Sequence, residues 1–318
     1  MIRALSATAG GPLTSPRRVA LTITPGRRLL LLSALIGQLG IAHAQAPAPS
    51  GPPTFKFARD QKRVLGVYSA RQNQAAYQLF EAAFTAALRQ GTHDVDYYAE
   101  YLDYGRVPTT DAYLRAFRDL MREKYANRPP DVIFAISEGA FAFVKEHGSD
   151  LFGDAPVILV GPGERWLPHS FTVMFEYDWA DSVELALRLQ PETKRVYVVA
   201  GSSQYDRELL NTVRAGLGGV ARRMEVIYLD SAPIEHLEQT LATLPPESII
   251  FFVLLTQDGA GRTFEGLSGL DRIARVANVP IYSWSATMMG HGIVGGVQAT
   301  YEEAARATAD LTLQLLNG

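Results

Sequence analysis

The sequence predicts an α/β protein built from two doubly wound parallel-sheet lobes that are joined by a hinge. From Arg63 onward, short β-branched runs alternate with amphipathic helical stretches, the pattern of a parallel sheet covered by helices on both faces. The alternation stops once, between Gly163 and Asp178, and then starts again. The chain has 318 residues, 47% of them hydrophobic, which is enough for two cores.

The first lobe is expected over residues 63–165. Short apolar runs rich in Val, Ile and Tyr predict its strands, at 63–68, 95–101, 132–136 and 156–160. Apolar residues spaced three and four apart predict its helices, at 74–89, 110–126 and 138–146.

The second lobe is expected over residues 179–299, after a hinge or crossover at 166–178 that contains a short extended segment, 171–175. The same patterns predict strands at 195–200, 224–229, 248–255 and 280–284, with a further extended stretch at 293–297. They predict helices at 179–189, 205–216, 234–244 and 267–277. A last helix at 301–316, within the segment 300–318, is expected to return toward the first lobe.

The first 44 residues have the features of a signal peptide. Arg27 and Arg28 precede an apolar run over 29–41, which is shorter than the roughly 20 residues that span a bilayer. The small-x-small sequence Ala42-His43-Ala44 follows it, so we expect cleavage after Ala44. Residues 45–62 form the predicted linker, and their first part, 45–53, is rich in Ala, Pro, Ser and Gly. A periplasmic location is expected.

Composition removes several classes of function. The formal net charge of −3 provides no general attraction to phosphate, so nucleic acid is not an expected partner. The sequence has no cysteine, which excludes disulfides, thiolate nucleophiles and Cys-based zinc sites.

Small polar residues follow the predicted strands of both lobes. In open parallel α/β sheets, ligands bind beyond the carboxyl ends of the strands. The candidate ligand-binding residues are therefore Ser69, Arg71, Ser137, Glu138 and Gly161 in the first lobe, and Ser203, Tyr205, Asp206, Gln257, Asp258 and Trp284 in the second. For each serine, the alternative is a helix N-cap.

These residues leave the ligand open. Glu138, Asp206 and Asp258 favour a ligand with an amino group or several hydroxyls, whereas Arg71 and helix N-termini could hold a carboxylate. Both kinds of charge together would suit an amino acid.

The sequence contains no recognisable set of catalytic residues, and we predict that the protein is not an enzyme. Ser137 follows Ile136 and lacks the Gly-x-Ser-x-Gly context of a nucleophile elbow, and no dinucleotide or phosphate-loop fingerprint is present. The histidines are scattered singly, so neither a metal nor a cofactor is expected. A hydrolase that uses Ser137 or Ser203 is the remaining enzymatic alternative.

Four stretches carry a resemblance to a known family: 100–103, 117–133, 258–264 and 290–296. They resemble the substrate-binding proteins of ABC transporters with the type I periplasmic-binding fold. The sequence is most similar to the branch that also occurs as extracytoplasmic sensor domains of histidine kinases. The resemblance extends over about residues 63–316.

The resemblance implies a monomer that traps a small-molecule ligand between its lobes by hinge closure, in a pocket drawn from the candidate residues above. The implied partner is the membrane permease of an ABC transporter or, alternatively, a membrane sensor kinase. Family members continue after the last helix with another crossover and strand, whereas this sequence stops at Gly318. Either the sequence is a fragment or the lobe is shortened.

Overall fold

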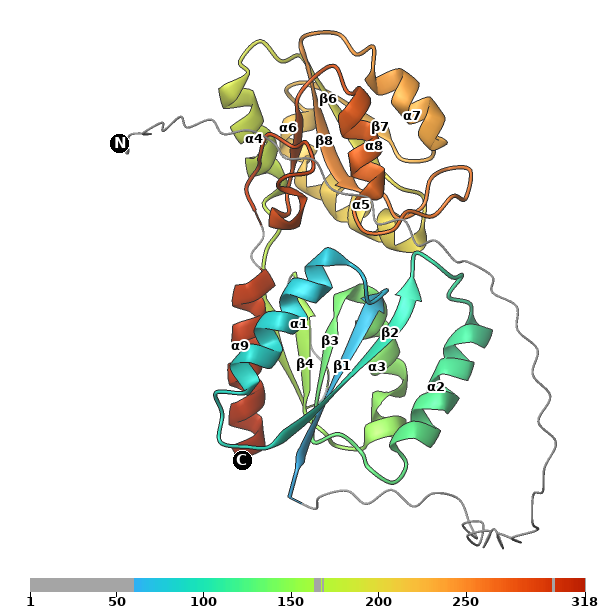
Figure 1. The fold of residues 1–318 in the computed structure, drawn as a ribbon, viewed down its shortest axis with the longest axis vertical. Helices are drawn as coiled ribbons and strands as arrows, with labels where there is room; N and C mark the ends of the chain where they lie inside the picture. The colour runs from blue at the N-terminus through green and yellow to red at the C-terminus, as the bar shows by residue number, and fades with distance from the viewer. Residues whose placement is uncertain (1–59, 163–166, 168, 299–300, 318) are drawn as a thin grey trace, which may run out of the picture. The chain divides into compact units, whose positions relative to one another are not determined.

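The computed structural model describes residues 60–162, 167, 169–298 and 301–317 (Figure 1). The predicted signal peptide, and the predicted linker up to residue 59, lie outside these residues. Within the described part of the chain, no helix is both long and apolar enough to cross a membrane.

The first lobe is a five-stranded parallel sheet with the strand order β2-β1-β3-β4-β5. Its strands are β1 (Lys62–Ala70), β2 (Val95–Tyr104), β3 (Val132–Ile136), β4 (Val157–Gly161) and β5 (Ser170–Met174). Its helices are α1 (Ala75–Leu88), α2 (Asp111–Tyr125), α3 (Ser137–Phe152) and α9 (Tyr301–Asn317).

Helices α1 and α9 cover one face of this sheet, and α2 and α3 cover the other (Figure 1). The alternation along β1 explains the two layers. Val64 and Tyr68 pack in the core with α1 and α9, while Leu65 and Val67 pack in the core with α2 and α3. Successive side chains of a strand point to opposite faces, so a strand buried on both sides is apolar throughout.

The second lobe is a four-stranded parallel sheet with the order β7-β6-β8-β9. Its strands are β6 (Arg195–Ala200), β7 (Glu225–Leu229), β8 (Ser248–Leu254) and β9 (Ile281–Ser283). Its helices are α4 (Trp179–Leu189), α5 (Gln204–Gly216), α6 (Gly218–Ala221), α7 (Ile234–Leu241) and α8 (Ser268–Val276), with the 3₁₀ turn η1 (Ala286–Met288). Every residue of β8 is buried, as expected for a central strand covered on both faces.

The structure confirms the predicted α/β class with parallel sheets. Among its differences from the expected elements are the following three. The range 166–178, expected as the hinge, contains β5, which pairs with β4 and belongs to the first sheet. The stretch 293–297 forms no strand and makes one bridge, from Gly295 to Tyr282. Helix α3 runs to Phe152 instead of ending at residue 146.

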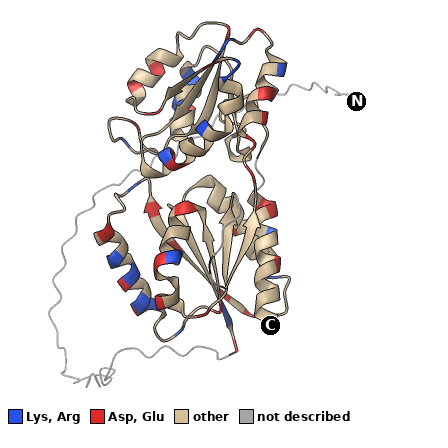
Figure 2. Cartoon of the chain, turned by 180° about the vertical axis from the view of Figure 1, so that it is seen from behind, with Lys and Arg blue, Asp and Glu red and all other residues tan. Residues whose placement is uncertain are grey.

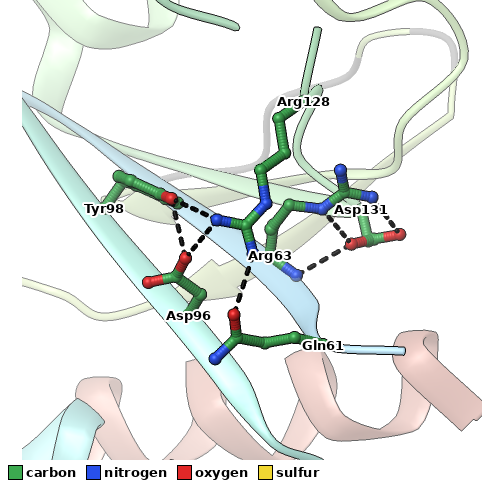
Figure 3. Close-up of polar contacts among 6 residues, drawn as sticks. All are labelled: Gln61, Arg63, Asp96, Tyr98, Arg128 and Asp131. Carbon is green, nitrogen blue, oxygen red and sulfur yellow. Dashed lines mark hydrogen bonds and ion pairs between the residues drawn. The ribbon is translucent and has the colours of Figure 1, made fainter. Parts of the chain in front are cut away.

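A polar cluster joins the starts of β1, β2 and β3 (Figure 3). Arg63 donates to Asp131 from its backbone N over 2.8 Å and from Nε over 3.2 Å. Arg128 donates to Asp96 over 2.8 Å, and also to Tyr98 and Gln61. Elsewhere the strands are mostly uncharged, and most of the charged residues lie on helices and loops (Figure 2).

Candidate functional site

A cavity of about 210 Å³, here called the central cavity, lies among segments that follow β3, β4, β5 and β6. Residues from both lobes line it: Ser137, Glu138, Pro162, Tyr177, Tyr205, Glu208, Leu209, Asn211 and Thr212. It therefore occupies the position at which parallel α/β sheets bind ligands, beyond the carboxyl ends of their strands.

Tyrosine hydroxyls gather beside the central cavity. The hydroxyl of Tyr77 lies 3.3 Å from Ser137 Oγ and is hydrogen-bonded to Tyr205. A second pair, Tyr177 and Tyr301, is also hydrogen-bonded. Burial raises the pKa of all four hydroxyls, so these side chains are neutral phenols at physiological pH.

Tyr205 lines the central cavity and also a smaller space of about 30 Å³, here called the inner cavity. Trp284 and Tyr301 line the inner cavity, and Tyr205 lines both. Trp284 donates from Nε1 to the carbonyl of Val253 over 2.7 Å, which fixes the indole against the second sheet.

Two carboxylates belong to the wall of the central cavity. Glu138 lies in the first turn of α3 and Glu208 in α5. The pKa of Glu208 is raised, mainly by burial and also by the negative charge of Glu138. Gln204 opposes the shift by donating to Glu208 over 3.0 Å, as does the positive charge of Arg207.

Arg71 is buried but does not line the central cavity. Its guanidinium donates to the carbonyl of Phe264, which ties the loop after β1 to the second lobe. Burial, followed by the positive charge of Arg106, lowers the pKa of Arg71. Its Nε has no hydrogen-bond partner among the described residues.

Two of the predicted aspartates, Asp206 and Asp258, accept hydrogen bonds from backbone N–H groups of neighbouring loops. The buried carboxylate of Asp206 accepts from the backbone of Ser203, Thr256 and Gln257. Asp258 accepts from the backbone N of Ile234, Ala260 and Arg262 over 2.9 to 3.0 Å. Because these oxygens serve as internal acceptors, neither aspartate is aimed at a ligand in this structure.

Two serines from the candidate set also have structural partners. Ser69 Oγ donates to the carbonyl of Ile136 over 2.9 Å and accepts from Ala140 N over 2.8 Å, at the start of α3. Ser203 is the N-cap of α5 and forms a capping box with Asp206. Ser203 therefore has the helix N-cap role that was the alternative to ligand binding.

The last two candidates, Gly161 and Gln257, do not line the central cavity. Gly161 ends β4, and a side chain there would meet the ring of Phe141 at 3.0 Å. Gln257 lines a separate space of about 340 Å³, here called the outer cavity, together with Arg106 and Arg207. Of the eleven predicted residues, Ser137, Glu138 and Tyr205 line the central cavity.

Apart from Tyr205, the sequence reasoning missed the face of α5 that makes the largest contribution to the cavity wall. Tyr205, Glu208, Leu209 and Thr212 all line the cavity, and they are spaced three, four and seven residues from the first. This is the spacing of one helix face. The signal was present in the sequence, but attention to strand ends passed over residues deeper in the helix. Tyr177 was missed because it lies in the range 166–178, which the sequence indicated as a hinge and not as the end of a sheet strand.

No protein-family model matches the sequence, and no curated protein matches it. Solved structures do match. The ligand-free, open structure of a substrate-binding protein with adhesive properties from Clostridium difficile is 15% identical, with a TM-score of 0.55, over 81% of this chain and 85% of that one.

Two further structures are similar to the same extent. An ABC domain in complex with L-Trp from Streptococcus pneumonia has a TM-score of 0.55 at 13% identity, over 81% of this chain and 85% of that one. A periplasmic sugar-binding protein of an ABC sugar transporter from Legionella pneumophila has a TM-score of 0.54 at 16% identity, over 81% and 95%. The chain thus has the fold of the type I periplasmic binding proteins.

Proposed function

We propose that this protein is a periplasmic solute-binding protein that captures a small organic molecule in the central cavity and delivers it to an ABC-type permease. One observation carries the proposal: residues that follow strands of both sheets line a single cavity in a type I periplasmic-binding fold. A ligand held by both lobes stabilises the contact between them, which couples binding to recognition by a membrane partner.

The proposal of transport draws on similar structures, which include a substrate-binding protein and a periplasmic sugar-binding protein of an ABC sugar transporter. The proposal includes no chemical step. Ser137 Oγ lies 3.3 Å from the hydroxyl of Tyr77, whose pKa is raised. A neutral phenol is a weak base, which argues against Ser137 as a nucleophile.

Native mass spectrometry of the chain recovered from the periplasm tests capture. We expect a co-purified small molecule that dissociates on mild denaturation. Thr212→Trp, at the exposed rim of the cavity, should abolish its retention by filling the space. Thr243→Trp, an equal change at an exposed position after α7, is the control and should retain the molecule. Equal retention by both variants would contradict binding at this site.

Export and delivery have separate tests. N-terminal sequencing of the periplasmic protein should begin at Gln45, the residue after the expected cleavage site. A strain without this protein should lose uptake of the identified solute and regain it with the wild-type chain but not with Thr212→Trp. Full uptake in the deleted strain would contradict a transport role and favour sensing.

A further inference from the structure

The outer cavity is formed by loops that belong to different lobes. Its volume of about 340 Å³ exceeds that of the central cavity. Residues 105–110, after β2, line it from the first lobe, and residues 202–204 with Arg207, after β6, line it from the second. Gln257, after β8, also lines it. None of these residues lines the central cavity, so the two cavities are separate spaces.

The walls of the outer cavity are held in place by direct contacts within the protein. The hydroxyl of Thr109 donates a hydrogen bond to Gln204 Oε1, which joins the loop after β2 to the start of α5. Gly105 comes so close to the second lobe that an added Cβ would lie 3.2 Å from Ser203 Oγ. Ser203 in turn forms the capping box of α5 with Asp206. The cavity is therefore formed in advance, which lowers the entropy that a ligand must lose on binding.

Each lobe contributes one arginine to the outer cavity. Arg106 donates from Nη2 to Asp103, in a pair whose side chains are 56% and 21% exposed. Arg207 donates from Nη1 to the carbonyl of Ser202. A guanidinium carries five N–H donors, so both arginines keep donors beyond these two bonds.

The electrostatic surroundings of the outer cavity favour an anion. No carboxylate is among the described residues that line it, and the structure describes its loops without a gap. The carbonyl bonded to Arg207 is neutral and does not balance the arginine's charge. Arg71 adds to the positive charge nearby, since burial and then the charge of Arg106 lower the pKa of Arg71. Glu208, the acidic neighbour of Arg207 in sequence, lines the central cavity instead.

The arginines also indicate which kind of anion fits. The planar fork of a guanidinium matches a phosphate group, to which it can donate two parallel hydrogen bonds. Arginines on two separate loops suit a group that presents several oxygens in different directions. A phosphate alone would fill only part of a space that is larger than the central cavity, so an organic body attached to it can be accommodated.

We propose that the outer cavity is a second binding site, which holds the phosphate group of a small phosphorylated molecule between Arg106 and Arg207. The site lies apart from the central cavity and goes beyond the proposed function. Since the two arginines come from different lobes, a phosphate held by both would also stabilise the contact between the lobes.

The test is calorimetry on the wild-type chain at constant ionic strength, with glycerol 3-phosphate, inorganic phosphate and neutral glycerol as probes. We expect glycerol 3-phosphate to bind with a Kd of about 1 mM or tighter, and glycerol to give no measurable binding. Weaker binding of inorganic phosphate would support a phosphorylated organic molecule as the occupant. Equal or tighter binding of inorganic phosphate would support the phosphate site with free phosphate as its occupant. The absence of binding by both phosphate compounds would overturn the proposal.

Variants locate the bound phosphate. Arg106→Gln and Arg207→Gln should each weaken binding of glycerol 3-phosphate about tenfold, because each removes a charged donor. Both side chains are exposed, and circular dichroism checks that the variants fold. Arg222→Gln, at an exposed position after α6, is the control and should leave the affinity unchanged. Unchanged affinity in both cavity variants would overturn the proposal.

The variant that fills the central cavity separates the two sites. Thr212→Trp should retain full affinity for glycerol 3-phosphate, because Thr212 does not line the outer cavity. Loss of this affinity in Thr212→Trp would place the phosphate in the central cavity and overturn the inference. A chain that retains a solute but binds no phosphate also overturns the inference and leaves the proposed function intact. A chain that binds phosphate through both arginines but retains no solute supports the inference and contradicts the proposed function.

Discussion

The carboxylate of Asp206, in the first turn of α5, accepts two hydrogen bonds from Thr256: one from the backbone N over 3.1 Å and one from the hydroxyl over 2.8 Å. Ser203 and Gln257 donate further backbone N–H groups to the same carboxylate. Asp206 thus joins the start of α5 to the loop after β8, and α5 is the helix that supplies one wall of the central cavity.

Replacing Asp206 by alanine should lower the free energy of unfolding by about 3 kcal/mol, because several buried donors would lose their acceptor. Urea denaturation monitored by circular dichroism measures the change. Asp310→Ala, at an exposed position of α9, is the control and should cause no loss. A loss of less than about 0.5 kcal/mol in Asp206→Ala would contradict the structural role.

The polar cluster in Figure 3 predicts a second stability effect. Asp131→Asn removes the charged partner of Arg63, and the two side chains are only 23% and 28% exposed. We expect a loss of about 1 to 2 kcal/mol in the free energy of unfolding, since a partly buried charged acceptor is stronger than an exposed one. Glu225→Gln, in the more exposed pair with Arg195, should cost less. The reverse order in thermal denaturation would argue against a stabilising role for the cluster.

The affinity of the central cavity for a positively charged solute should fall as the pH falls. Because the pKa of Glu208 is raised, mainly by burial, its carboxyl takes up a proton at a higher pH than an ordinary glutamate. Protonation removes one of the negative charges that attract such a solute. The other charged groups that act on Glu208 are Glu138, which raises this pKa, and Arg207, which lowers it.

The measurement is a calorimetric series in the acid range from pH 7 downward, with affinity expected to fall as Glu208 becomes protonated. In Glu208→Gln this loss should be absent over the same pH range, because the variant has no carboxyl at this position. The tyrosines do not contribute, since the pKa of both Tyr177 and Tyr205 is raised. An identical pH dependence in wild type and variant would exclude Glu208 as the titrating group.

Gly105, which follows β2, lies close to residues of the second lobe. Its φ is 92°, and an added Cβ would lie 3.1 Å from Thr256 Oγ1 and 3.2 Å from Ser203 Oγ in the second lobe. Gly290 has a similar φ of 86° but open space around it, so Gly290→Ala is a matched control for backbone strain. Both variants should lose about 1 kcal/mol to that strain.

Gly105→Ala should lose about 1 kcal/mol more than the control, because the new methyl group is crowded by the other lobe. Its affinity for the retained solute should also fall, while that of Gly290→Ala should not. Urea unfolding and calorimetry measure the two effects. Equal stability and equal affinity in the two variants would contradict a close contact at this point.

Much of the fold could be predicted from periodicity, because strands buried on both faces and helices with one apolar face leave strong sequence patterns. The strand β5 was harder to assign. It is short, Phe171 and Met174 are exposed, and only its pairing with β4 reveals the sheet to which it belongs. Pairing is a long-range property that five residues of local sequence do not encode.

The central cavity lies at the strand ends that the sequence indicated, but most of the residues that line it were not predicted. Strand ends indicated Ser137, Glu138 and Tyr205, which the structure brings to one cavity. The sequence could not separate them from Asp206 and Asp258, because a carboxylate that caps backbone groups and one that faces a cavity are the same residue type. Only the hydrogen-bond partners distinguish the two roles.

Helix α9 packs against α1 and against β3, β4 and β5, although the whole second lobe separates it from them along the chain. During synthesis, residues 179–297 are complete before residues 301–317, which pack against α1, β3, β4 and β5, are made. Until then the part of the first lobe that α9 covers presents apolar surface to the solvent. The order of synthesis therefore makes the first lobe the last to mature, and it makes this part the region most exposed to aggregation while the chain is incomplete.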